Sequence, residues 1–191
     1  MAISTINQNG LNAPLTLTSP VLTTPTISTG AGTASFPSAT GTVMVSGNMP
    51  AFFANLSASN QSISSNTGTK IAFDAVIFDT NNNFSVANNR FTPTVAGYYQ
   101  FSGGAYYASS GVGAYIMRIY KNGSEYIRGS QISGGTGAST QPNISCLLYA
   151  NGTTDYFELW TSQSTVASIN IQANNTTPYL TFFMGALVRT A

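Results

Sequence analysis

The chain has 191 residues, of which 42% are hydrophobic and 6% are charged, and its formal net charge at pH 7 is +1. This charge excludes the electrostatic footprint of a nucleic-acid-binding protein or of a protein bound to an anionic membrane. With no histidine, one cysteine and five carboxylates, the chain lacks the residues for a Ser-His-Asp or Cys-His centre and for a His/Cys metal cluster. We therefore expect no enzyme, no catalytic or metal-binding residues and no cofactor.

The opening of the chain carries no charge. No Asp, Glu, Lys or Arg occurs from Met1 to Thr69, and every charged residue lies from Lys70 onward. Such a segment is poorly solvated when it is fully exposed to water, so we expect neighbouring molecules to cover much of it. Met1–Thr5 has neither the basic region nor the apolar run of a secretion signal, and no stretch is apolar enough for a membrane span. We expect synthesis in a cytoplasm.

A short repeat lies within this opening. The pattern hydroxyl-Pro-x-aliphatic-hydroxyl occurs in Ser19–Thr23 and again in Thr24–Ser28, after the alternating run Leu15–Thr18. Its prolines exclude a central strand, so we expect an extended, polyproline-like or edge-strand conformation. Gly30–Thr33 interrupts the segment, and Ala34–Val45 offers one more short β-prone stretch.

This opening, residues 1–45, has two interpretations. It is either a flexible linker rich in Thr, Ser and Pro, or an extended arm that docks on a scaffold or on its sister arms. The regular spacing of its aliphatic residues favours the arm. The predicted anchoring residues are Leu15, Leu17, Pro20, Leu22, Pro25 and Ile27.

From Pro50 onward, short β-prone runs alternate with turn signals. The strongest turn signal is Asn122-Gly123, because this pair accepts positive φ angles at both central positions of a hairpin. No helical periodicity of useful length occurs. Evenly spaced short strands predict an all-β sandwich or jelly roll. The predicted strands are 51–56, 70–78, 97–107, 114–121, 124–132, 142–149, 154–161, 167–172 and 180–188.

A set of residues occurs at defined spacings in this region, namely Phe73, Asp79, Phe84, Phe91, Gly97, Tyr99 and Phe101. This set resembles the signature of C1q-type globular domains. The signature ends on an aromatic residue where this chain has Gly103, and we expect Tyr106 and Tyr107 to compensate. The segments 51–54, 115–123, 155–159 and 181–187 are also similar to family strands.

The resemblance implies a C1q/TNF-like jelly roll of about ten antiparallel strands over residues 46–191. Family members are jelly rolls that form trimers through aromatic and aliphatic faces, so it also implies a homotrimer. Under this interpretation, a set of aromatic residues fills the core or the trimer interface. These residues are Phe73, Phe84, Phe91, Tyr99, Phe101 and Phe182.

The arm has a resemblance of its own. Leu17–Ile27 is similar to Thr-Ser-Pro-x-Leu stretches in structural proteins of tailed bacteriophages. This implies a trimeric head fibre, a decoration knob or a tail fibre on the virion surface, assembled in the host cytoplasm, and the chain's modest length favours the head. Its partners would be itself, a capsid or tail protein bound through the arm, and a host-surface glycan or protein. The alternative is a secreted C1q-like module that recognises a carbohydrate or a protein.

The remaining candidate sites give weaker signals. Asp79–Asn83 offers oxygen ligands for calcium, although one carboxylate with amides makes a weak site, and a solvated loop is the preferred interpretation. Two carboxylates could serve a glycosidase, but Asp155 and Glu158 resemble strand-edge residues and structural roles are favoured. Cys146 is expected to act as a small buried hydrophobic residue.

A group of tyrosines has two interpretations. Tyr106, Tyr107, Tyr115 and Tyr126 occur among Gly and Ser residues. They form either a face that binds sugar or protein, or the core of a trimer. The sequence does not choose between the two and assigns no ligand-binding residue.

Overall fold

The computed structural model describes residues 26–29, 32–35 and 49–191, which form strands β1 to β17 and no helix. The chain divides into two compact units, Met1–Thr42 and Val43–Ala191. The predicted boundary lay between residues 45 and 46. The all-β fold expected from the sequence is confirmed for the described ranges.

In the first unit, β1 (Thr26–Thr29) and β2 (Gly32–Ser35) pair as an antiparallel hairpin. Ile27, one of the predicted anchoring residues, lies in β1 opposite Ala34. The expected interruption at Gly30–Thr33 is wrong in part, because Gly32 and Thr33 already pair with β1. The other predicted anchoring residues lie outside the described residues, namely Leu15, Leu17, Pro20, Leu22 and Pro25.

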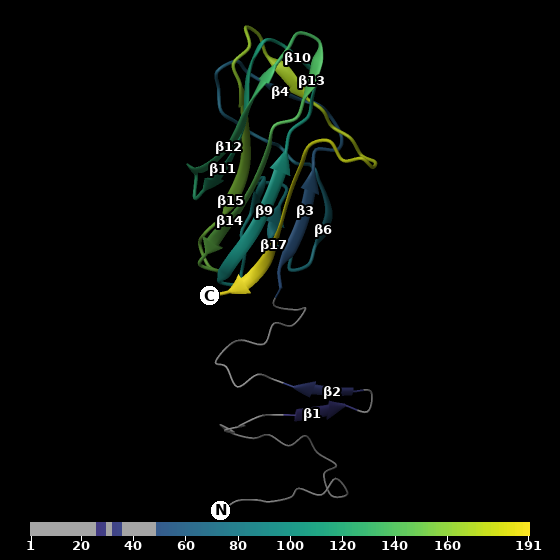
Figure 1. The fold of residues 1–191 in the computed structure, drawn as a ribbon, viewed down its shortest axis with the longest axis vertical. Helices are drawn as coiled ribbons and strands as arrows, with labels where there is room; N and C mark the ends of the chain where they lie inside the picture. Colours follow the sequence, from purple (N-terminus) through teal and green to yellow (C-terminus); the bar gives the residue numbers. More distant parts are fainter. Residues whose placement is uncertain (1–25, 30–31, 36–48) are drawn as a thin grey trace, which may run out of the picture. The chain divides into compact units, whose positions relative to one another are not determined.

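The second unit is a sandwich of two antiparallel sheets (Figure 1). The C-terminal strand β17 runs through the middle of the first sheet, between β9 and β3. This sheet has five strands, in the order β14 (Asn143–Ala150), β9 (Gly97–Gly104), β17 (Phe182–Thr190), β3 (Ala51–Asn55) and β6 (Ala75–Asp79).

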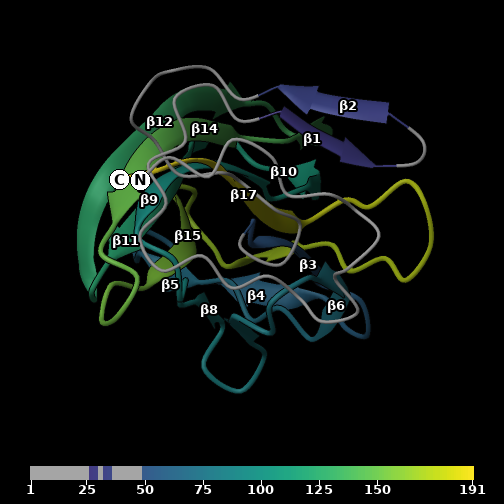
Figure 2. The ribbon, with the colours of Figure 1, turned by 90° about the horizontal axis from the view of Figure 1, so that it is seen from below.

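The second sheet has β15 at its centre, which pairs with β11, β8 and β5. Figure 2 shows its long strands β11 and β12 curving around one side of the unit. Two small sheets complete the unit, β10 (Tyr107–Ser110) with β13 (Ala138–Thr140), and β16 (Ile169–Ile171) with β4 (Gln61–Ile63). The second sheet contains β12 (Ser124–Gly134), β11 (Gly113–Lys121), β15 (Phe157–Gln163), β8 (Arg90–Phe91), β7 (Phe84–Ser85) and β5 (Thr69–Lys70).

The predicted Asn-Gly turn is confirmed. Asn122 and Gly123 have φ angles of 54° and 80° and connect β11 to β12. Both angles are positive, as a tight two-residue hairpin requires.

The predicted single strand over residues 70–78 is wrong, because the chain changes sheets within it. Thr69–Lys70 belongs to the second sheet and Ala75–Asp79 to the first. Between them, Ile71 and Phe73 are both buried, so the chain crosses the edge of the core. Asp74 then turns outward, and its carboxylate accepts the backbone N–H groups of Ser57 and Ala58.

The core between the two sheets is largely aromatic. The ring of Phe52 stacks on Phe91 with centroids 4.2 Å apart, and Phe101 packs against Phe157 at 4.6 Å. Contacts of this kind stabilise a core beyond the area that they bury. The aromatic pattern that supports the family resemblance therefore forms the interior of one protomer.

Candidate self-association face

Among the residues that the structure describes, the outer face of the five-stranded sheet has no internal partner, whereas the inner face packs on the core. Its register places Phe53, Met184, Ser102 and Ser145 in one row across four strands. The next row holds Ala51, Ala186, Gln100 and Leu147. We call these two rows, with Phe78, Phe182, Tyr98 and Tyr149, the outer face.

Aromatic side chains cluster at both ends of the outer face. The ring of Phe53 meets the rings of Phe78 and Phe182 edge-on, with centroids 6.1 and 6.0 Å apart. Tyr98 and Tyr149 form a second pair, with centroids 5.6 Å apart. These rings provide large contact areas with little conformational freedom to lose on binding.

No charged residue lies in the two central rows of the outer face. Its exposed apolar side chains include Met184, which is 38% exposed, and Leu147, which is 53% exposed. Its polar side chains partly satisfy one another, since Gln100 donates to Ser145 Oγ at 2.9 Å and the Ser102 and Ser145 hydroxyls lie 3.3 Å apart. An apolar, uncharged face of this kind is typical of the central part of a protein–protein interface.

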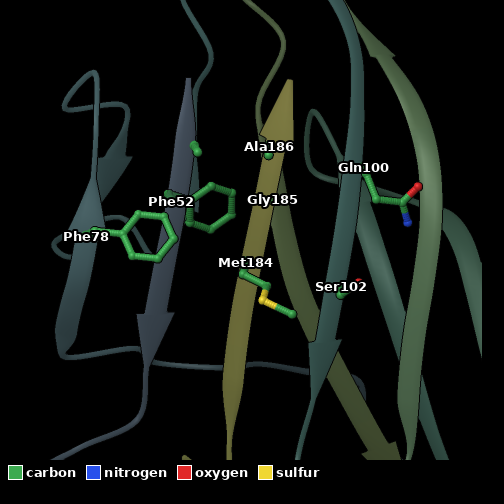
Figure 3. Close-up of a pocket in the computed structure, with 8 residues that line it drawn as sticks. Phe52, Phe78, Gln100, Ser102, Met184, Gly185 and Ala186 are labelled. Atoms are coloured by element: carbon green, nitrogen blue, oxygen red, sulfur yellow. The ribbon is translucent and has the colours of Figure 1, made fainter. Parts of the chain in front are cut away.

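The outer face also contains a shallow apolar hollow of about 220 Å³. In Figure 3 the Phe78 ring and the Met184 side chain lie on either side of β3. The lining of the hollow includes the apolar residues Ala51, Phe78, Met184 and Ala186. The hollow is therefore suited to an apolar side chain from a second molecule.

The structure divides the aromatic residues that the sequence assigned to a core or a trimer. Five of them are buried within one protomer. Phe182 alone is partly exposed and lies on the outer face beside Phe53. The five buried residues are Phe73, Phe84, Phe91, Tyr99 and Phe101.

Sequence reasoning missed most of the outer face, although a signal was present. In β17 the inward residues Phe183 and Leu187 alternate with the outward residues Met184 and Ala186, so both faces are apolar. A strand that is apolar on both faces is typical of a strand covered on both sides. The pattern was therefore a signal for an apolar outer face on this strand.

The tyrosine group does not form one face. Tyr107 and Tyr115 are fully buried, with ring centroids 4.8 Å apart, whereas Tyr126 is exposed. Burial raises the pKa of Tyr107 well above its ordinary value.

The signature of C1q-type domains ends on an aromatic residue where this chain has Gly103. A Cβ on Gly103 would lie 2.6 Å from Leu159 Cδ2. Leu159 therefore occupies the space that a larger side chain at position 103 would need.

The expectation that Asp155 and Glu158 are strand-edge residues is wrong. Both are buried, and Glu158 lies within the central strand β15, where Oε1 is 3.0 Å from Lys70 Nζ. Burial raises the pKa of Asp155, but hydrogen bonds from Lys121, Asn122 and Asn151, together with the Lys121 charge, hold its pKa below the ordinary value. Each of the two carboxylates is therefore paired with a lysine inside the fold, and both have structural roles.

The Asp79 carboxylate accepts hydrogen bonds from backbone N–H groups of its own turn. Oδ2 accepts the Phe84 N–H at 2.6 Å, and Oδ1 accepts the Asn81 N–H at 3.4 Å. Over the ranges that the structure describes, no group of three or more His, Cys, Asp or Glu residues is placed to hold a metal ion. Those ranges also contain no helix that is long and apolar enough to cross a membrane.

Comparisons with known proteins agree with this architecture. Among solved structures, the globular domain of zebrafish complement 1qA protein is 16% identical, with a TM-score of 0.51 over 74% of this chain and 98% of that chain. Eiger TNF from S. frugiperda is 9% identical, with a TM-score of 0.57 over 75% and 95%. Murine APRIL at pH 8.5 is 8% identical, with a TM-score of 0.52 over 73% and 99%. These likenesses concern the fold alone.

The sequence comparisons give the family. No curated protein sequence matches the chain. A family model described as the C1q domain matches residues 51–184, which is most of the chain and nearly all of the sandwich. The chain therefore belongs to the C1q-domain family.

Proposed function

We propose that the chain is a non-catalytic binding module that works as a homotrimer, with the outer face buried between protomers. The observation that carries this proposal is the pair of central rows of the outer face, which hold exposed apolar side chains and no charged residue. Burying apolar surface contributes about 25 cal/mol per Å², so covering Met184, Leu147 and the flanking aromatic rings favours association. Homologous domains of this family form homotrimers, which also supports self-association.

Light scattering of the full-length chain, beside a variant that begins at Ser46, tests this proposal. If the sandwich is the assembly unit, each protein has three times the mass of its own chain. A monomeric truncated variant would contradict the proposal, because assembly would then depend on residues 1–45.

We further propose that the trimer is a structural protein on the surface of a tailed-phage virion. Residues 1–45 would anchor it to a capsid or tail protein. The sandwich would project as a head fibre or decoration knob and bind a host-surface glycan or protein. This location rests on the sequence of the arm, which has no charged residue and carries the five-residue repeat.

Mass spectrometry of purified particles from the phage that encodes the chain tests the location. The full-length chain should co-purify with the particles, and the variant that begins at Ser46 should not. If both remain in the supernatant, the alternative of a free recognition module replaces the virion role. That alternative draws support from the same fold and the same trimer.

A further inference from the structure

The outer surface of the second sheet carries an unusual concentration of charge for this protein. Of the six basic and five acidic residues in the chain, three basic and two acidic residues lie here, together with the only tryptophan. The strand register brings them onto one face of β12, β11, β15 and β5. We call this group the platform. It consists of Lys70, Arg118, Tyr120, Glu125, Arg128, Glu158 and Trp160.

Two stacked rings form the centre of the platform. Tyr120 and Trp160 are partly exposed and lie nearly parallel, with centroids 4.3 Å apart and an interplanar angle of 16°. The turn before β5 borders them, since a Cβ on Gly68 would lie 3.7 Å from Tyr120 Oη and 4.0 Å from Trp160 Cε3. The backbone at Gly68 therefore lies directly beside the two rings.

Hydrogen bonds fix the orientation of the tryptophan. Its Nε1 donates to Glu158 Oε2 at 3.0 Å, and the other carboxylate oxygen accepts from Lys70 Nζ, also at 3.0 Å. Lys70 also donates to the Asn88 carbonyl at 3.1 Å. The indole is thus held in place before any ligand arrives, which lowers the entropic cost of binding.

A second ion-paired group lies beside the rings. Arg118 Nε lies 3.0 Å from Glu125 Oε2, and Arg128 Nη2 lies 2.7 Å from Glu125 Oε1. Arg118 is opposite Trp160 in the register and also donates to Ser162 Oγ. The Arg128–Glu125 pair is the more exposed of these ion pairs, and exposed ion pairs contribute little to stability, so a stabilising role does not account for this pair.

We infer that the platform binds a neutral saccharide. The C–H face of a pyranose ring packs on an exposed aromatic side chain, and its hydroxyl groups both donate and accept hydrogen bonds. The platform offers both complements, the partly exposed aromatic pair and the exposed Arg128–Glu125 ion pair. A strongly anionic ligand would face Glu125, and a cationic ligand would face Lys70 and the two arginines. The inference rests on the proposed role as a binding module, and the proposed trimer leaves the platform accessible because it buries the other sheet.

The single tryptophan makes the platform directly observable. Intrinsic tryptophan fluorescence of the full-length chain is recorded during titration with neutral oligosaccharides built from glucose, galactose, mannose or N-acetylglucosamine. Sialylated and sulfated oligosaccharides serve as anionic counterparts. We expect at least one neutral series to change the emission with a saturating dependence, and the anionic series to bind more weakly. Preference for the anionic series, or no saturable change with any neutral sugar, would overturn the inference.

Calorimetry on variants localises the binding. Trp160→Ala and Tyr120→Ala should each weaken binding of the sugar found by fluorescence by about tenfold or more, because they remove the stacking surface. Tyr126→Ala is the matched control, since Tyr126 is an exposed aromatic residue outside the platform. Unchanged affinity in Trp160→Ala would overturn the inference. Light scattering of the same variants reports trimer formation separately, so a failure of the trimer is distinguishable from a failure of the platform.

Discussion

Lys121 Nζ lies 2.8 Å from Asp155 Oδ2, and this ion pair joins the end of β11 to the loop before β15. Asn122 Nδ2 donates to Asp155 Oδ1 at 2.8 Å, and the Asn151 N–H donates to Oδ2 at 3.0 Å. Lys121 also lies 5.8 Å from the centre of the Tyr149 ring. The buried carboxylate of Asp155 therefore holds the β11–β12 hairpin against the loop before β15.

Replacing this carboxylate should destabilise the sandwich strongly. Asp155→Ala removes the carboxylate that balances the Lys121 charge in a largely buried site, and we expect a loss of about 3 kcal/mol in the free energy of unfolding. Urea unfolding at pH 7 measures it. Glu125→Gln is the control, because its ion pairs are more exposed and should cost less than about 1 kcal/mol. Equal losses in the two variants would contradict this account.

The same carboxylate gives the stability a defined pH dependence. The folded-state pKa of Asp155 lies below its ordinary value of 3.8, so its contribution is fully present above about pH 4. The contribution is lost as the pH falls through the lower folded-state pKa. The stability difference between the wild type and Asp155→Ala should therefore shrink as the pH falls below 4. Urea unfolding at pH 6, 4 and 3 checks this, and a difference that stays constant would contradict it.

Two glycines with similar backbone angles should respond differently to substitution. Gly137 and Gly152 have φ angles of 74° and 72°. A Cβ at Gly137 meets nothing within 4 Å, whereas at Gly152 it would lie 2.8 Å from the Val95 carbonyl carbon. Gly137→Ala should cost only the strain of the left-handed conformation, about 1–2 kcal/mol. Gly152→Ala should cost more, and thermal unfolding that ranks the variants in the reverse order would contradict this account.

Sequence reasoning predicted the fold but not the apolar outer face of the five-stranded sheet. The aromatic spacing from Phe73 to Phe101 predicted the sandwich because these residues fill the core of one protomer. The outer face was missed because strands β9 and β14 mix Ser and Gln with Tyr and Leu on that side, which gives a weak hydrophobic pattern. The burial of Glu158 was missed because its neutralising partner, Lys70, is 88 positions away. Spacing within one strand does not reveal such a partner.

The cysteine should react slowly. Cys146 is partly buried and packs against the core, and burial raises the pKa of its thiol to about 11. Little thiolate is then present at neutral pH, and the thiolate is the reactive form. We expect labelling by a soluble disulfide reagent at pH 7.5 to be more than about tenfold slower in the folded protein than in urea. Equal labelling rates would show that the thiol is accessible and unperturbed.

The central claim is that the outer face holds protomers together, and a charge placed on that face tests it most directly. Met184 lies in one of the two central rows of the outer face, so Met184→Lys would bury an unpaired ammonium in the proposed interface. Val166→Lys is the control, because Val166 is fully exposed in the loop after β15. Sedimentation equilibrium should give three times the chain mass of 20.0 kDa for the wild type and Val166→Lys, and a monomer for Met184→Lys. A monomeric wild type, or a Met184→Lys variant that stays trimeric, would contradict the account.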